Sequence, residues 1–398
     1  MKKFLYCFLF SSLLFANEKS NEVLMPLKNE IRDLETKSIE EKKEVNKYEW
    51  LNDLNISLSQ SKDDENIKTK DYSLNLNQKI LDFGGISSQI DYANNLFKQE
   101  ALKIKMENFE DLNTLYKNFI DLKINDINIL QNDLNIKNSE IEVDIKKSQY
   151  RNGQSDISDL NDAIMKKNLL EDSKMNLKLN KVIYENDIKK LTSYELNNLS
   201  IPSISLISKD IFLEKSTKKL YANLESQVSQ NEYKKTKSKY LPALNLTGAV
   251  GYQDSTTKKS QDYYNYGASI TMPLNYTFSN DIEYSKLVYL QNRKKEELTS
   301  IELEKVYDSS IETIKQFENR INLALNDIKL YEELLELNQE EFNAGFKADE
   351  DIKTLKNSKE IRKLDIEKYK LNIKKERIRS FFVSIFQILQ NSVTRKGT

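Results

Sequence analysis

Apolar residues recur along this chain at two different periods, and each change of period predicts a change between helix and strand. Spacings of three and four residues predict a helix, because about 3.6 residues complete one helical turn. Strict alternation predicts a strand, whose successive side chains point to opposite faces. The first helical stretch, residues 21–47, carries one stripe made of Leu24, Leu27, Ile31 and Leu34. We expect a peripheral helix there.

Alternation occurs in two segments, residues 49–81 and residues 243–276, and each has a polar tract at its middle. The apolar positions of the first segment are Leu54, Ile56, Leu58, Tyr72, Leu74 and Leu76. Those of the second are Leu244, Leu246, Val250, Tyr252, Tyr264, Tyr266, Ala268, Ile270 and Met272. Asparagine, serine and threonine hold most positions between them. Each segment is therefore predicted to be a hairpin of two strands with one apolar and one polar face.

A long helical pattern follows the first strand hairpin. No glycine or proline interrupts residues 90–150, which predicts a helix roughly 90 Å long at about 1.5 Å per residue. The chain breaks at Asn152 and Gly153 and then returns in a second helical run. Residues 90–192 are therefore predicted to form a long antiparallel coiled-coil hairpin.

The second half of the chain repeats this order of elements. Residues 283–389 are predicted to form another helical hairpin, and a helix over residues 208–239 precedes the second strand hairpin. The break of the second helical hairpin, Gly345, lies 192 positions after Gly153. The pattern therefore indicates an internal duplication, with a first repeat over residues 17–200 and a second repeat over residues 201–398.

The first 16 residues have the features of a secretory signal peptide. Lys2 and Lys3 precede an apolar run that ends at Ala16, as in signals that are removed during export. The run is shorter than the roughly 20 residues that a membrane-spanning helix needs, and no later apolar segment is longer. The one cysteine, Cys7, lies inside this run. The mature chain is therefore predicted to have no disulfide and no lipid anchor.

Composition restricts the chemistry that the chain can perform. The 61 basic residues almost balance the 62 acidic residues, which excludes the strongly basic surface that binds nucleic acid. The sequence has no histidine, and no cysteine follows the predicted signal peptide. Serine or cysteine nucleophiles activated by histidine, and metal sites built from imidazole or thiolate, are therefore excluded. We expect no catalytic residue, no bound cofactor and no metal site.

The two predicted strand hairpins need a way to cover their edges. An isolated hairpin is unstable in water, and a four-stranded sheet leaves two strands with unpaired backbone groups. Aromatic residues gather near the strand ends, where membrane interfaces favour them: Tyr48, Trp50, Tyr72, Tyr263, Tyr264 and Tyr266. A barrel shared between several copies of the chain would pair every edge within an outer membrane. The alternative is a small water-soluble sheet that caps a coiled coil.

Several local motifs resemble the TolC-like outer membrane efflux family over nearly the whole mature chain. The segments 76–85, 240–246 and 270–274 look like the ends of that family's strands. The strongest resemblance is in the two helix-hairpin turns, residues 150–160 and 342–352. In both turns an aromatic residue, two further residues and a glycine are followed by an aspartate six positions after the glycine.

This resemblance implies a fold that is mainly α-helical with a β-barrel part, built as a homotrimer. Each chain would contribute four transmembrane strands to one barrel, and its coiled-coil hairpins would continue the channel as a long periplasmic extension. The family acts at the outer membrane of Gram-negative bacteria, in contact with outer-membrane lipid. Its partners are a periplasmic adaptor protein and an inner-membrane pump or ATP-driven exporter. No nucleic acid is expected as a partner.

The duplicated turns are the candidate functional site, because the resemblance places them at the periplasmic entrance of the channel. The entrance candidates are Asp351, Asp159, Lys347, Tyr150 and Phe342, with Gly153 and Gly345 as the turn residues. Rings of carboxylates around a narrow mouth favour cations. The family's further acidic position is Thr354 here.

Each candidate also has a purely local interpretation. Glycines at these positions commonly cap the ends of helices. Acids in the first turn of a helix interact favourably with the helix dipole. We prefer this local interpretation for Asp156, Asp349 and Glu350. Tyr150 and Phe342 can equally be packing residues near a helix end. For Asp351 we favour the pore position.

Two functions remain open from sequence. The first is a passive exit duct in a tripartite efflux or type I secretion system, for small molecules, metal ions or proteins. The second is a periplasmic or surface coiled-coil protein that transports nothing. Only the first requires an oligomer that is inserted in a membrane and conducts ions.

Overall fold

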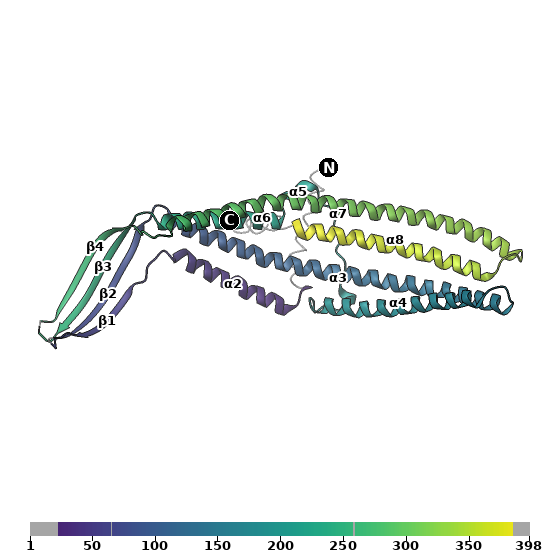
Figure 1. Ribbon diagram of the computed structural model, residues 1–398, viewed down its shortest axis with the longest axis horizontal. Coiled ribbons are helices and arrows are strands. Elements are labelled where there is room, and N and C mark those ends of the chain that lie inside the picture. The colour runs from purple at the N-terminus through teal and green to yellow at the C-terminus, as the bar shows by residue number, and fades with distance from the viewer. Residues whose placement is uncertain (1–22, 65, 258, 385–398) are drawn as a thin grey trace. The chain divides into compact units, whose positions relative to one another are not determined.

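The computed structural model of the chain describes residues 23–64, 66–257 and 259–384. The predicted signal peptide, residues 1–16, and the end of the last predicted helix, residues 385–389, lie outside these described residues. Figure 1 shows the elements. In chain order the helices and strands are α2 (Pro26–Tyr48), β1 (Asn55–Lys62), β2 (Lys68–Leu81), α3 (Gly85–Arg151), α4 (Ile157–Lys189), a short 3-10 helix (Leu196–Asn198), α5 (Lys209–Glu214), α6 (Thr217–Lys239), β3 (Ala243–Ser255), β4 (Gln261–Thr271), α7 (Phe278–Asn343) and α8 (Asp349–Ser384).

The described chain forms two compact units. One unit, which we call the tip unit, contains the described residues 23–30, 107–216 and 302–384. The other, which we call the sheet unit, contains residues 31–106 and 217–301. Each unit therefore takes its residues from both halves of the sequence, so the compact units cut across the two predicted repeats.

In the sheet unit, β1 to β4 form one antiparallel sheet within the described residues, in the order β1-β2-β3-β4. The register pairs Ile56 with Leu74, Leu74 with Val250, and Val250 with Tyr264. Because paired residues share a face, these apolar side chains lie on one side of the sheet. Asparagine, serine and threonine share the opposite side, as the alternation predicts. We call the two sides the apolar face and the polar face.

Polar contacts fix the helices of the sheet unit close to where the strands begin and end. Gln89 of α3 donates to the backbone carbonyl of Asn46 at the end of α2, at 2.7 Å. The Tyr240 hydroxyl, just before β3, donates to Asp281 in the first turn of α7. Tyr233 of α6 stacks on Tyr289 of α7 with 6.5 Å between ring centroids.

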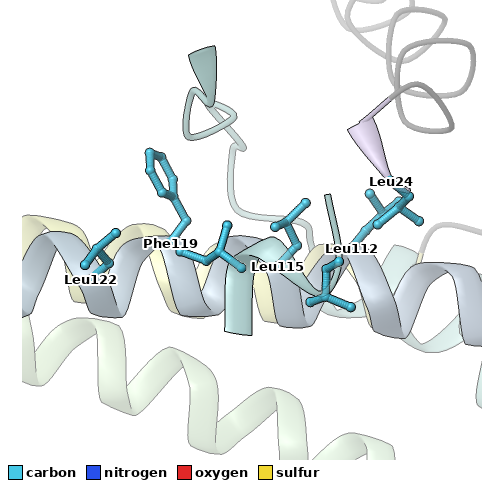
Figure 2. Close-up of a cluster of buried hydrophobic side chains, with 7 residues drawn as sticks. Leu24, Leu112, Leu115, Phe119 and Leu122 are labelled. Atoms are coloured by element: carbon cyan, nitrogen blue, oxygen red, sulfur yellow. The ribbon is translucent and has the colours of Figure 1, made fainter. Parts of the chain in front are cut away.

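In the tip unit, α3 and α4 form one antiparallel helical hairpin, and α7 and α8 form another (Figure 1). The hydrophobic core of this unit lies along α3. Its buried side chains are Leu24, Leu112, Leu115, Phe119, Leu122, Ile188 and Leu191. Figure 2 shows Leu24 beside Leu112, so the segment before α2 covers one end of this cluster. The backbone N–H of Met25 donates to the carbonyl of Leu191 at 2.9 Å, which fixes that segment in place.

Some bounds differ from those that the sequence predicts. Helices α3 and α7 each begin five residues earlier than predicted, at Gly85 and Phe278. The helix predicted over residues 208–239 is divided into α5 and α6 by a break at Lys215 and Ser216. Serine directly before a helix favours a new helix start, because its side chain can cap free N–H groups. The periodic pattern continues through this break and therefore conceals it.

Among residues 23–384, with residues 65 and 258 left aside, no helix combines the length and the apolar character needed to cross a bilayer.

Candidate functional site

The turns that join α3 to α4 and α7 to α8 have the same backbone structure. In the first turn the N–H of Gly153 donates to the carbonyl of Tyr150 at 3.1 Å, and the N–H of Gln154 donates to that of Gln149 at 2.8 Å. In the second, Gly345 donates to Phe342 at 2.9 Å and Phe346 donates to Glu341 at 2.9 Å. This pair of bonds defines the Schellman motif that ends many helices.

Glycine is needed in both turns because of the backbone angle rather than the available space. Gly153 has φ +70° and Gly345 has φ +80°, and a Cβ atom added at either position would meet no atom within 4 Å. Left-handed backbone costs residues with a side chain about 1–2 kcal/mol. The structure therefore places both predicted turn glycines at equivalent positions.

The acids of the first turn are bound by neighbouring side chains. Asp156 caps the start of α4 by accepting from the N–H of Ile157. The Ser155 hydroxyl donates to Asp159 at 2.7 Å, and Lys146 Nζ lies 3.7 Å from the same carboxylate. The hydrogen bond from Ser155 and then the charge of Lys146 lower the pKa of Asp159. Ser155 therefore holds the Asp159 carboxylate in place, and Lys146 offsets part of its charge.

In the second turn one acid is paired and the candidate acid Asp351 is not. Asp349 pairs with Lys353 in the first turn of α8 at 2.7 Å. Asp351 is exposed, and within the described residues no side chain donates to its carboxylate. Lys347, the basic residue that the resemblance suggests for the gate, lies 4.0 Å from Glu341 instead. Phe346, which follows the turn glycine, is 83% exposed.

A groove of about 930 Å³ within the tip unit lies between the second turn and the helices of the first hairpin. Lys347 and Asp351 line it from the second hairpin, and Lys146 lines it from the first. Ser139, also in its lining, has a buried hydroxyl without a hydrogen-bond partner in the described structure.

The two candidate aromatic residues also occupy equivalent positions. Tyr150 is the last residue but one of α3, and Phe342 is the last residue but one of α7. Both side chains are exposed, Tyr150 at 45% and Phe342 at 39%. Neither is therefore buried in the core of its own hairpin.

Two residues of this site were not found from the sequence. Lys146 pairs with Asp159 and Ser155 donates to it, and neither residue belongs to the motif shared by the two turns. The pairing of Lys146 with Asp159 could have been predicted from the geometry of the hairpin. In an antiparallel hairpin, residues at similar distances from the turn face each other, and Lys146 and Asp159 lie seven positions before and six positions after Gly153.

No family model matches the sequence, and a sequence search of curated proteins finds no match. Solved structures are similar in fold. The Vibrio cholerae outer membrane protein VceC has a TM-score of 0.72 at 14% identity, over 92% of this chain and 95% of that chain. The Campylobacter jejuni CmeC outer membrane channel has a TM-score of 0.72 at 15% identity, over 95% and 88%. The Neisseria gonorrhoeae MtrE outer membrane channel, in its open state, has a TM-score of 0.61 at 11% identity, over 92% and 88%.

These likenesses confirm the predicted fold class. The chain is mainly helical with a four-stranded antiparallel sheet in its described residues, and it has the TolC-like fold of these outer membrane proteins.

Proposed function

From this fold we propose that the chain is one subunit of a homotrimeric channel in the outer membrane of a Gram-negative bacterium. It acts as a passive exit duct for small molecules, metal ions or proteins in a tripartite efflux or type I secretion system. The three chains form one twelve-stranded barrel, and their helical hairpins extend into the periplasm. A periplasmic adaptor and an inner-membrane pump or ATP-driven exporter complete the system. The chain itself supplies no catalytic step.

The observation that carries this proposal is an apolar sheet face that is left exposed. On it, Ile56 is 76% exposed, Tyr266 is 86% exposed and Ile270 is 75% exposed. A water-soluble protein rarely leaves such a contiguous apolar surface uncovered. A lipid bilayer would cover it, since membrane barrels turn apolar residues outward and polar residues inward.

The free edges of the sheet support a shared barrel. β1 and β4 each pair on one side only within the described residues. Unpaired backbone groups cost several kcal/mol each inside a bilayer. Pairing β4 of one subunit with β1 of the next would satisfy both edges and would close the sheet around the polar face.

Along the apolar face, an aromatic pair and then a charged pair follow one another toward the turn end of the sheet, as at the boundary of a bilayer. Tyr72 and Tyr252 lie next to each other toward the turn end of the sheet, with 6.3 Å between ring centroids. Beyond them, on the same face, come Lys70 and its partner Asp254. Tyrosine is favoured at the membrane interface and charged residues are favoured beyond it, so one boundary of the bilayer would lie at the two tyrosines.

The second candidate function, a coiled-coil protein that transports nothing, gives the sheet faces no role. A soluble cap would bury the apolar face against its own chain. In the described residues the apolar face is left exposed, which favours the channel.

Isolated outer membranes provide the test. We expect the chain in this fraction, and chemical cross-linking after detergent extraction should give a ladder that ends at three subunits. A soluble periplasmic monomer or dimer would refute the channel.

Two neighbouring substitutions on β1 sharpen this test. A lysine on the lipid side of a barrel costs about 2–4 kcal/mol at mid-membrane, whereas a lysine on the lumen side is tolerated. Ile56→Lys should therefore strongly reduce the amount of trimer in the membrane, and the adjacent Ser57→Lys should leave it nearly unchanged. Equal effects of the two substitutions would contradict the assignment of the faces.

A further inference from the structure

The polar face of the sheet carries almost no charge. Its side chains are serine, threonine, asparagine, glutamine, alanine, glycine and one tyrosine, with two exceptions, Asp71 and Lys79 on β2. Lys79 lies at the end of β2 that leads into α3, whereas Asp71 lies near the turn from β1. The turn end of the polar face therefore has a single charged group in its strands.

Asp71 is held in place from two strands away. The Tyr263 hydroxyl of β4 donates to both carboxylate oxygens of Asp71, at 3.0 and 3.2 Å. The tyrosine ring crosses β3 at Gly251, where an added Cβ would lie 2.6 Å from the ring. Glycine at this position therefore leaves room for the Tyr263 ring to pass over β3. The hydrogen bonds from Tyr263 then hold the Asp71 carboxylate at the surface of the polar face.

Among the residues that the structure describes, no lysine or arginine pairs with this carboxylate. Within the described residues Asp71 makes no salt bridge, and the Tyr263 hydroxyl that binds it is neutral. Lys68 and Lys70 are near in sequence, but alternation places them on the apolar face. Lys79 is eight residues away along the strand, about 27 Å at roughly 3.4 Å per residue. That distance exceeds three Debye lengths at physiological salt, so Lys79 does not offset the charge of Asp71 there.

We propose that Asp71 determines charge selectivity at the outer mouth of the pore. This inference rests on the proposed trimeric barrel, in which threefold symmetry places three Asp71 carboxylates around the lumen near the turn end. A ring of carboxylates raises the local concentration of cations and lowers that of anions. The ring lies at the opposite end of each strand from the helices and is separate from the candidate acids of the helix-hairpin turns.

Reversal potentials of purified channels in planar bilayers test this inference, under a KCl gradient. Asp71→Asn should lower the ratio of potassium to chloride permeability by at least about twofold in roughly 10 mM salt, where the Debye length is about 30 Å and the field of the ring extends across the lumen. The difference should vanish near 1 M salt, where the Debye length is about 3 Å. Asp262→Asn is the matched control, because this exposed acid lies near the same end of the sheet but on the apolar face.

A cysteine at position 71 gives a second measurement that does not depend on comparing separately folded variants. The natural chain has no cysteine other than Cys7, so Asp71→Cys can be labelled alone. A thiol reagent that adds a sulfonate should restore cation preference in the open channel. A reagent that adds a quaternary ammonium should shift the preference toward anions.

The possible results separate this inference from the proposed function. If the unmodified trimer, Asp71→Asn and both labelled forms of Asp71→Cys conduct with the same selectivity in low salt, the Asp71 assignment is overturned and the channel stands. An equal change with Asp262→Asn would also overturn it, because the effect would then not belong to the lumen. Absence of any trimer or conductance in the unmodified chain would instead refute the proposed function.

Discussion

At the scale of single residues, the acids that follow the two helix-hairpin turns differ in how far their charge is compensated. Asp159 accepts from Ser155 at 2.7 Å and lies 3.7 Å from Lys146. Asp351 holds the equivalent position six residues after its turn glycine and has no such donor within the described residues. Equivalent positions in the two repeats therefore have different neighbouring side chains.

This difference predicts unequal effects of two matched substitutions. Asp351→Asn should reduce block of the channel by divalent cations by several-fold, because an uncompensated carboxylate ring attracts them. Asp159→Asn should have a smaller effect, since Lys146 already offsets part of the charge of that carboxylate. Single-channel recordings with added divalent cations measure both. A larger effect of Asp159→Asn would contradict the compensation argument.

The sequence predicted the turn glycines because their requirement is local. A left-handed backbone angle at a helix end favours glycine whatever surrounds it, and both positions have that angle. The partners of Asp159 and Lys347 could not be predicted in the same way. They depend on which rotamers meet across a hairpin, and the motif itself does not contain Lys146 or Ser155.

At the scale of elements, a buried polar node joins the two helical hairpins. Gln131 of α3 donates to Asp365 of α8 at 2.9 Å and accepts from Lys368 at 2.9 Å. Arg362 binds the other carboxylate oxygen of Asp365 at 3.0 Å and also lies 3.1 Å from Asp327 of α7. A single polar group among apolar coiled-coil contacts can fix the register of the helices. This node would do so for α3, α7 and α8.

Loss of the Asp365 carboxylate should lower the free energy of unfolding, by an amount that depends on pH. Burial raises the pKa of Asp365, but hydrogen bonds from Gln131 and Lys368 outweigh burial, so the pKa is lowered overall. Its contribution is therefore present above the unfolded pKa of about 3.9 and is lost as the pH falls through the lower folded value. Asp365→Asn should destabilise the protein by about 2–3 kcal/mol at pH 7, and the loss should shrink in acid.

Thermal unfolding followed by circular dichroism at several pH values measures this effect. Glu360→Gln is the control, because Glu360 lies on the same helix and pairs with Lys363 at an exposed site. Exposed pairs contribute about 0–1 kcal/mol. The role of the node would be contradicted if Asp365→Asn lost no more stability than Glu360→Gln. It would also be contradicted if the loss of stability were the same in acid as at pH 7.

The periodic pattern predicted the elements but not this node. Long runs without glycine or proline, with apolar stripes, were sufficient to place α3, α4, α7 and α8 within a few residues. Gln131, Asp365 and Lys368 are ordinary polar residues in a sequence in which 31% of residues are charged. Their meeting depends on the relative register of two hairpins more than 200 residues apart in sequence, which no local pattern contains.

At the scale of the whole molecule, the organisation along the sequence and the organisation in space differ. The sequence repeats once, with turn glycines 192 positions apart, whereas the compact units group corresponding parts of both repeats. This arrangement follows from the order of elements. In each half the chain passes from strands into a long helix and returns, so equivalent segments of the two halves meet in the same unit.

The central claim is that this chain forms a conducting pore, and single-channel recording tests it most directly. Purified detergent-extracted protein, added to a planar bilayer, should produce discrete and uniform conductance steps. The steps should appear for the unmodified chain and for Ser57→Lys, and should be rare for Ile56→Lys, which fails to insert. A folded, membrane-extracted protein that produces no conductance steps would contradict the account.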